Sequence, residues 1–179
     1  ANILSALNRK GEALKAYDAA LAQRPGFFEG EFNRANLLME LGRLEEALAG
    51  YERAVAARAD VPSAWNNRGA VLRRMHRPDA ALASHDRALA LAPGHVNALI
   101  NRGMALKDLE RTKEAEAAAD AALALQPDAS EALHLKSASA LETGRIGEAQ
   151  GLFARRRQAA PKQPAALNGL ARAAALAGD

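Results

Sequence analysis

One period of 34 residues runs through the 179-residue chain, and it constrains the fold more than any other feature. Five columns keep this register without an insertion. Their members are small, bulky or proline residues: Ala13, Ala47, Ala81, Ala115 and Ala149; Ala20, Ala54, Ala88 and Ala122; Tyr17, Tyr51, His85, Ala119 and Phe153; Ala35, Gly69, Gly103, Ser137 and Ala171; and Pro25, Pro93, Pro127 and Pro161. Agreement among five columns predicts a repeat protein in which each unit buries its apolar face against a neighbour.

The sequence of the unit from Phe28 to Val61 predicts two helices. The pattern predicts a first helix over about 29–41 that stops at Gly42, because glycine suits the left-handed C-cap. A second helix is expected from about Leu44 to Arg58, and its acidic first turn favours the positive end of the helix dipole. Leu38 is expected on the inner face of the first helix, as are its counterparts in the next two units, Leu72 and Leu106.

The period divides the chain into units that form a single all-α array with no strand. We expect a partial unit over 1–27, four full units over 28–61, 62–95, 96–129 and 130–163, and a closing helix over 164–179. Because Ala1 falls within a helical pattern, we expect the chain to be a fragment of a longer protein. The absence of an initiator Met leaves a removed N-terminal leader open.

The columns resemble the tetratricopeptide repeat, a 34-residue helix–turn–helix unit. In the third unit the residues at that family's spacing are Trp65, Gly69, Leu72, Ala81, Ala88 and Pro93. The resemblance implies a right-handed α-solenoid of stacked repeats, whose first helices line a concave groove that binds a peptide or protein segment. The chain departs from the family in a column that often holds leucine and here holds Arg34, Arg68, Arg102 and Lys136.

Three asparagines, Asn33, Asn67 and Asn101, recur at the same period on the polar face of the first helices. An asparagine amide offers a donor and an acceptor, so this column matches the backbone of an extended peptide without reading its side chains. The alternative is that the amides satisfy neighbouring helix ends or water. The candidate peptide-binding residues are Asn33, Asn67, Asn101, Asn36, Asn66, Phe32, Ile100, Met104, Arg73, Arg74, Lys107 and His134.

Two known asparagine arrangements bear on this column. It resembles the asparagine ladder in the superhelix of O-linked N-acetylglucosamine transferase, which holds extended protein substrates, but the ladder stops at Leu135. Repeat domains that capture the acidic tails of heat-shock chaperones use a clamp of lysine, arginine and two asparagines. Asn36 and Asn67 match the two asparagines, whereas Phe32 stands where the first lysine is required, so the clamp is incomplete.

Composition excludes several function classes. There is no cysteine, and the four histidines never lie three or four residues apart, so no metal site and no cofactor is expected. The phosphate-loop and nucleophile-elbow motifs are missing, which predicts a chain without enzyme activity. A net charge of +3 and 4% aromatic residues argue against a nucleic-acid partner, and no apolar run is long enough for a membrane span. The run Arg155–Arg157 suits the negative end of a helix.

The sequence therefore predicts a protein-interaction scaffold that binds an extended peptide or protein segment in a concave groove. Two alternatives stay open: self-association into a homo-oligomer through the apolar closing helix, and the substrate-presenting arm of a glycosyltransferase whose catalytic domain lies outside the chain. The alanine and arginine content suggests a bacterial source, and we expect a cytoplasmic protein.

Overall fold

The structure, a computed structural model, describes residues 2–159, and it describes side chains from residue 9 to residue 158. This part of the chain is entirely helical. Its helices are α1 (Asn2–Gln23), α2 (Phe28–Glu40), α3 (Leu44–Ala57), α4 (Pro62–Arg74), α5 (Pro78–Leu91), α6 (Val96–Asp108), α7 (Thr112–Leu125), α8 (Ser130–Glu142) and α9 (Ile146–Ala159). They fall into two compact units, Ala1–Pro93 with α1–α5 and Gly94–Asp179 with α6–α9. The expected closing helix over 164–179 lies outside the described residues.

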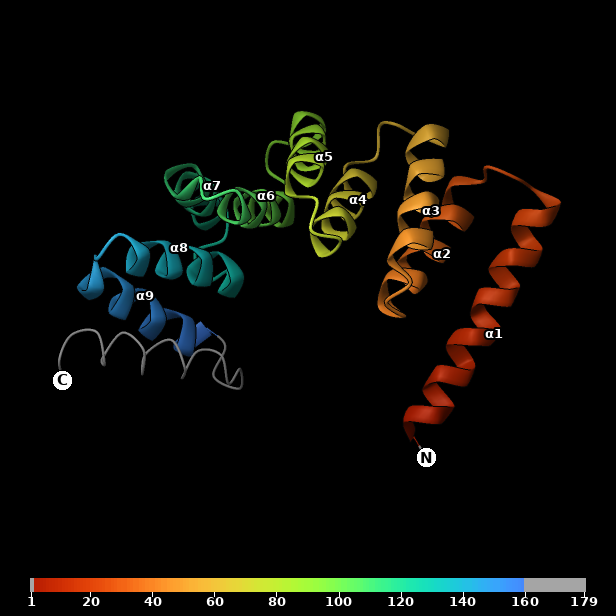
Figure 1. Cartoon of the computed structure of the whole chain (residues 1–179), viewed down its shortest axis with the longest axis horizontal. Helices are drawn as coiled ribbons and strands as arrows, with labels where there is room; N and C mark the ends of the chain where they lie inside the picture. The colour runs from red at the N-terminus through yellow and green to blue at the C-terminus, as the bar shows by residue number, and fades with distance from the viewer. Residues whose placement is uncertain (1, 160–179) are drawn as a thin grey trace. The chain divides into compact units, whose positions relative to one another are not determined.

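Each unit is built from helix pairs joined by short turns (Figure 1). In unit 1 α2 packs on α3 and α4 packs on α5, and in unit 2 α6 packs on α7 and α8 packs on α9. The first helices begin at Phe28, Pro62, Val96 and Ser130, one sequence period apart. The two helices predicted within 28–61 are confirmed, since α2 ends one residue before Leu41 and α3 begins at Leu44. The fold is therefore the predicted all-α repeat of helix–turn–helix units.

The repeated columns form the core. Ala47, Ala81, Ala115 and Ala149 are completely buried, as are the inner-face leucines Leu38, Leu72 and Leu106. Alanine has a short side chain, so the two helices of a pair approach closely at this column while leucine fills the space beside it. Gly69 shows how close the approach is, because a Cβ atom there would lie 2.5 Å from the ring of the buried His85.

The turn inside each pair contains one residue with left-handed backbone. Gly42 and Gly144 have φ angles of 75° and 74°, which cost glycine little. At the same place in the other two pairs His76 and Glu110 have φ angles of 55° and 60°. Side chains seldom adopt this conformation, so the two turns store strain that the packed helices on either side must hold.

The basic column that departs from the family pattern has a structural role. The guanidinium of Arg34 lies 2.6 Å from Asp18, that of Arg68 lies 3.1 Å from Glu52, and the ammonium of Lys136 lies 2.6 Å from Asp120. In each case the acid precedes the base by 16 residues and sits on the second helix of the preceding repeat. In this column an ion pair between repeats thus takes the place of an apolar contact. The alkyl stems of the long basic side chains can still cover apolar surface.

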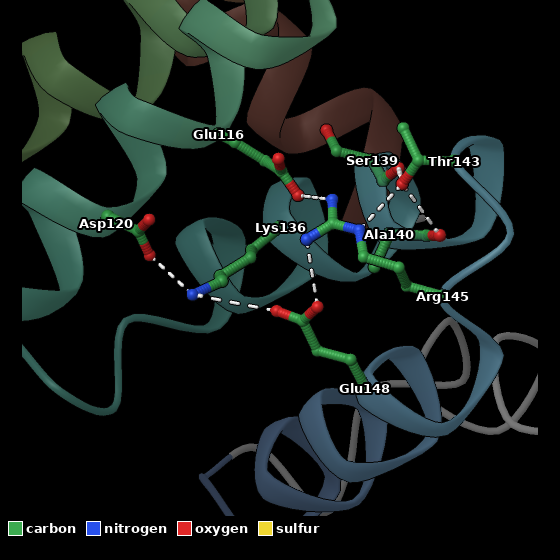
Figure 2. Close-up of polar contacts among 8 residues, drawn as sticks. All are labelled: Glu116, Asp120, Lys136, Ser139, Ala140, Thr143, Arg145 and Glu148. Carbon is green, nitrogen blue, oxygen red and sulfur yellow. Dashed lines mark hydrogen bonds and ion pairs between the residues drawn. The ribbon is translucent and has the colours of Figure 1, made fainter.

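In unit 2 one of these ion pairs extends into a network that joins three helices (Figure 2). Lys136 on α8 also lies 3.8 Å from Glu148 on α9, and Glu148 accepts a hydrogen bond of 2.9 Å from Arg145. Arg145 continues the network to Glu116 on α7. Because acids and bases alternate along it, the network holds the α8–α9 pair to α7 by electrostatic contacts beside the apolar core.

Two arginines of the run at the end of α9 form hydrogen bonds within the fold. Arg156 is only 6% exposed and donates a hydrogen bond of 3.2 Å to the hydroxyl of Ser130 at the start of α8. Arg155 donates a hydrogen bond of 3.1 Å to the carbonyl of Pro127. Arg156 therefore replaces the alanine of its column by reaching across the helix pair, and α8 and α9 still pack around Ala149 and Phe153.

Candidate functional site

In unit 1 the first helices α2 and α4 are neighbours, and their polar residues Asn33, Asn36 and Asn67 form a surface that we call the asparagine face. Asn66, which the sequence predicted to bind the peptide, is only 6% exposed, because its side chain turns into the packing between the helices, so it supports this surface from beneath. Asn67 Nδ2 donates a hydrogen bond of 3.0 Å to Asn36 Oδ1, which links one repeat to the next. Asn66 Nδ2 lies 3.4 Å from Asn67 Oδ1. The structure thus brings these asparagines of α2 and α4 together, and Asn67 contacts both Asn36 and Asn66.

The asparagine face rests on a buried tyrosine that the sequence analysis placed only in the core. The hydroxyl of Tyr51, on α3, donates a hydrogen bond of 2.6 Å to Asn36 Oδ1. Tyr51 is completely buried, and this burial raises the pKa of its phenol well above its ordinary value. The phenol therefore stays protonated as a donor, and it fixes the amide of Asn36 with its oxygen turned inward.

This orientation decides what the amides offer at the surface. Both hydrogen bonds at Asn36 use its oxygen, and no residue in the described part of the chain accepts a hydrogen bond from its Nδ2. Asn33 is exposed, and Asn67 is half-buried. The face consequently presents amide donors held in place from below, together with the whole amide of Asn33.

Aromatic rings flank the asparagine face on α2. The ring of Phe32 stacks on Phe28 with 5.6 Å between centroids, and it meets the ring of Tyr51 edge-on at 5.9 Å. Phe32 is half-buried against the cluster that contains Ala54 and Val55. Its ring is therefore a fixed apolar wall beside the amides, with only part of its surface available to a ligand.

The basic candidates near the ends of the first helices make contacts within the fold. Arg74 Nη1 donates a hydrogen bond of 3.0 Å to the carbonyl of Met39 at the end of α2, which also accepts one of 3.2 Å from the backbone N–H of Gly42. Lys107 on α6 forms an ion pair with Glu142 on α8. Arg73 is half-buried. These contacts join successive first helices within each unit, so the charges of Arg74 and Lys107 are already partly compensated.

The candidates on α6 lie deeper than those on α2 and α4. Ile100 is 5% exposed and belongs to a core cluster with Ala122 and Ala132, and Met104 packs against the same cluster. Asn101, the third member of the asparagine column, is half-buried. On α6 the apolar candidates therefore contribute mainly to the core of unit 2.

His134 on α8 faces several charged groups. Its Nδ1 lies 3.4 Å from Nη1 of Arg156 on α9. Partial burial lowers the pKa of the imidazole, the positive charges of Arg156 and Lys107 lower it further, and Glu131 opposes the shift. The neutral ring is consequently favoured in the folded chain, which suits a hydrogen-bonding side chain better than a cation.

The sequence analysis missed a cavity at the turn between α1 and α2. It has a volume of about 490 Å³, and its walls include Arg24, Phe27, Phe28, Glu29 and Arg58. The guanidinium of Arg24 lies 4.9 Å from the ring centre of Phe27, and that of Arg58 lies 4.8 Å from that of Phe28. Arg24 and Arg58 are one 34-residue period apart, so the sequence did contain a signal for this pair.

Within the described residues, no cluster of three or more histidine and acidic side chains could hold a metal ion. None of the helices in the same part of the chain combines the length and the apolar character that crossing a membrane requires.

Paired helices on a 34-residue period, with a polar face along successive first helices, define a helical repeat scaffold. The family models agree: residues 60–128 match the tetratricopeptide repeat model, and residues 35–75 match the TPR repeat model, so that together they span 35–128. The chain belongs to the tetratricopeptide repeat family. Repeats of this family are generally non-catalytic scaffolds for protein interactions. No curated protein matches the sequence.

Solved structures share the fold at low sequence identity. PilW, a widely conserved type IV pilus biogenesis factor, is 24% identical with a TM-score of 0.87, covering 94% of this chain and 79% of that one. YrrB, a TPR protein with an unusual peptide-binding site, is 23% identical with a TM-score of 0.73, covering 93% and 86%. A tetratricopeptide repeat protein from Parabacteroides merdae is 20% identical with a TM-score of 0.82, covering 99% and 70%. These likenesses concern the fold.

Proposed function

We propose that this chain is an interaction scaffold that binds an extended peptide or protein segment along its first helices, with the asparagine face making the contacts to the peptide backbone. The observation that carries the proposal is the hydrogen bond from Asn67 to Asn36, because it aligns amides from successive repeats in one row. A peptide in an extended conformation presents N–H and C=O groups along its length, and a row of amides matches them.

The packing beneath the row supports the same function. Tyr51 and Phe32 hold the amides and the wall beside them in fixed positions before any ligand arrives. Binding therefore costs the protein little conformational entropy, and most of the entropy lost on binding is that of the peptide. YrrB, which has the same fold, is a TPR protein with a peptide-binding site, and this likeness adds support without assigning the residues.

The test begins with a peptide selected from a displayed random library on the purified chain. Its affinity is then measured by calorimetry for the wild type and for the triple variant Asn33→Ala, Asn67→Ala, Asn101→Ala. At roughly 0.5–1.5 kcal/mol for each hydrogen bond, the triple variant should bind about 1.5–4.5 kcal/mol more weakly. Gln126→Ala is the matched control, because it removes an exposed amide from the turn after α7.

A second measurement asks whether the contacts are to the peptide backbone. Replacing single backbone amides of the selected peptide by thioamides weakens one C=O acceptor at a time and leaves every side chain in place, which matches the amide donors that the asparagine face presents. Loss of affinity at some carbonyl positions in the wild type, and no further loss in the triple variant, is the expected result. Equal affinity of the wild type and the triple variant for the parent peptide would refute the role of the asparagines.

A further inference from the structure

The cavity at the turn between α1 and α2 is unlike the asparagine face in its chemistry. Its walls combine two guanidinium groups with two aromatic rings, and each guanidinium lies over one ring, Arg24 over Phe27 and Arg58 over Phe28. An arginine that stacks on a ring keeps its planar face covered while the N–H groups at its edge stay directed outward. Stacking therefore prepares both groups to donate hydrogen bonds before a ligand arrives.

The charges around the cavity are not balanced. Arg58 is shared between two acids, since its Nη1 lies 3.3 Å from Glu29 and its Nε lies 3.8 Å from Asp60. Arg24 forms no ion pair with any residue whose side chain the structure describes, and its guanidinium contacts Phe27 instead. The walls themselves hold two cations and one carboxylate. The cavity can thus accept one further negative charge, and Arg24 is the group that lacks a partner for it.

The shape of the cavity favours a particular kind of anion. Phe28 is only 9% exposed, because Arg58 and Phe32 both lie against its ring. This arrangement leaves the ring no room to stack on a nucleobase. A volume of about 490 Å³ is within the usual range for small ligand sites, and the cavity is large enough for an amino-acid side chain with its neighbours. The fork of a guanidinium matches the two oxygens of a carboxylate.

We propose that this cavity is a second binding site, which takes a glutamate or aspartate side chain of an acidic peptide segment, with Arg24 as the residue that binds the carboxylate. Phe27 positions the guanidinium of Arg24, and Arg58 contributes to the positive field while it stays paired with Glu29. The site consists of residues outside the asparagine face, so it stands whether or not that face binds a peptide backbone.

The test uses two unlabelled six-residue probes, acetyl-(Glu-Leu)₃-amide and its isostere acetyl-(Gln-Leu)₃-amide, titrated into ¹⁵N-labelled chain and followed by NMR. The glutamate peptide should shift the Nε–Hε resonance of Arg24 and the amides of residues 24–29, and the glutamine peptide should not. Arg24→Gln should weaken binding of the glutamate peptide about tenfold, because one charge-assisted pair is lost. Arg24→Lys should bind the glutamate peptide with an affinity between those of the wild type and Arg24→Gln, because lysine keeps the charge but lacks the forked N–H groups.

Arg87→Gln is the matched control, because it removes one exposed positive charge from α5 and should change the affinity less than about twofold. Binding should also survive Asn33→Ala with Asn67→Ala, which separates this site from the asparagine face. Equal weakening by Arg24→Gln and Arg87→Gln would reduce the effect to net charge and overturn the proposal. Equal binding of the two probes, or loss of binding only in the asparagine variant, would overturn it as well.

Discussion

The side-chain oxygen of Asn36 accepts two hydrogen bonds, one of 3.0 Å from Asn67 in the next repeat and one of 2.6 Å from Tyr51 beneath it. This single oxygen connects the packed column of the second helices with the polar face of the first helices. The sequence left open whether the asparagines bind a ligand or satisfy the fold. At Asn36 the oxygen makes both hydrogen bonds within the fold, and the amino group of the same amide takes part in neither of them.

Tyr51→Phe should destabilise the chain, because it removes the hydroxyl and leaves the buried side of Asn36 with one donor fewer. A lost hydrogen bond of this kind costs about 1 kcal/mol in the free energy of unfolding. Urea denaturation followed by circular dichroism measures it. Tyr17→Phe is the matched control, since Tyr17 occupies the same column of the preceding unit and is only half-buried. Equal losses in the two variants would show that the Asn36 contact contributes nothing.

Gly69→Ala should destabilise the chain through a clash in the core. The added methyl group would lie 2.5 Å from a ring carbon of His85, and His85 is completely buried, so neighbouring side chains must move. Overpacking of this kind costs about 1–3 kcal/mol. Gly11→Ala is the contrasting variant, because a Cβ atom on that exposed part of α1 meets nothing within 4 Å. It should stabilise the helix by about 0.5–1 kcal/mol, and thermal unfolding of both variants checks the pair.

The sequence was sufficient to predict the helices, because their period, their alanine column and their turn glycine are local or strictly repeated signals. It was also sufficient to place Asn36 and Asn67 on one face. It could not show which way an amide turns, since that depends on the hydroxyl of Tyr51, which is 15 residues away and on another helix. The deep burial of Ile100 depends in the same way on α7 and α8, which supply the other members of its cluster.

Other contacts between repeats also have a signal in the sequence. The basic residues Arg34, Arg68 and Lys136 pair with Asp18, Glu52 and Asp120, and these acids recur on the same period. Reading the basic and acidic columns together would have predicted ion pairs between repeats. The left-handed turns show the opposite case. Glutamate rarely adopts this backbone and histidine adopts it far less readily than glycine, so at His76 and Glu110 only the register with Gly42 and Gly144 indicates it.

His76→Gly and Glu110→Gly should each stabilise the chain. Both residues hold φ angles in the left-handed region, which costs a side-chain-bearing residue about 1–2 kcal/mol, and glycine avoids this cost. The greater freedom of glycine in the unfolded chain offsets part of the gain, so we expect about 0.5–1 kcal/mol for each. Gly42→Ala should do the reverse, because it introduces a Cβ atom at a φ of 75°. A fall in melting temperature for both glycine variants would contradict the strain argument.

The stability of the chain should depend on pH through His134. Its pKa in the folded chain is lowered by partial burial and by the charges of Arg156 and Lys107. As the pH falls through about 6.5, the ordinary value, the unfolded chain takes up a proton at this residue before the folded chain does. The free energy of unfolding should therefore decrease from pH 7.5 toward pH 5.5.

Urea denaturation at these two pH values tests this expectation in the wild type and in His134→Gln. The glutamine variant should show a smaller decrease, because it has no proton to bind at this position. His76→Asn is the control: it removes an exposed histidine, and asparagine tolerates the left-handed backbone there. If His134→Gln kept the full decrease, other groups would account for the pH dependence.

Lys136→Met should destabilise unit 2 in a manner that depends on salt. The variant keeps the apolar stem of the side chain but leaves Asp120 and Glu148 without the shared cation that lies between them (Figure 2). We expect a loss of about 1 kcal/mol in the free energy of unfolding at low ionic strength, the upper end for a partly exposed ion pair. In 1 M NaCl the Debye length falls to about 3 Å, and the difference in stability between Lys136→Met and the wild type should shrink.

Lys113→Met on α7 is the control, because that exposed lysine lies outside the network and should change stability little at either salt concentration. A loss that is the same at low and high salt would instead assign the contribution of Lys136 to packing of its stem.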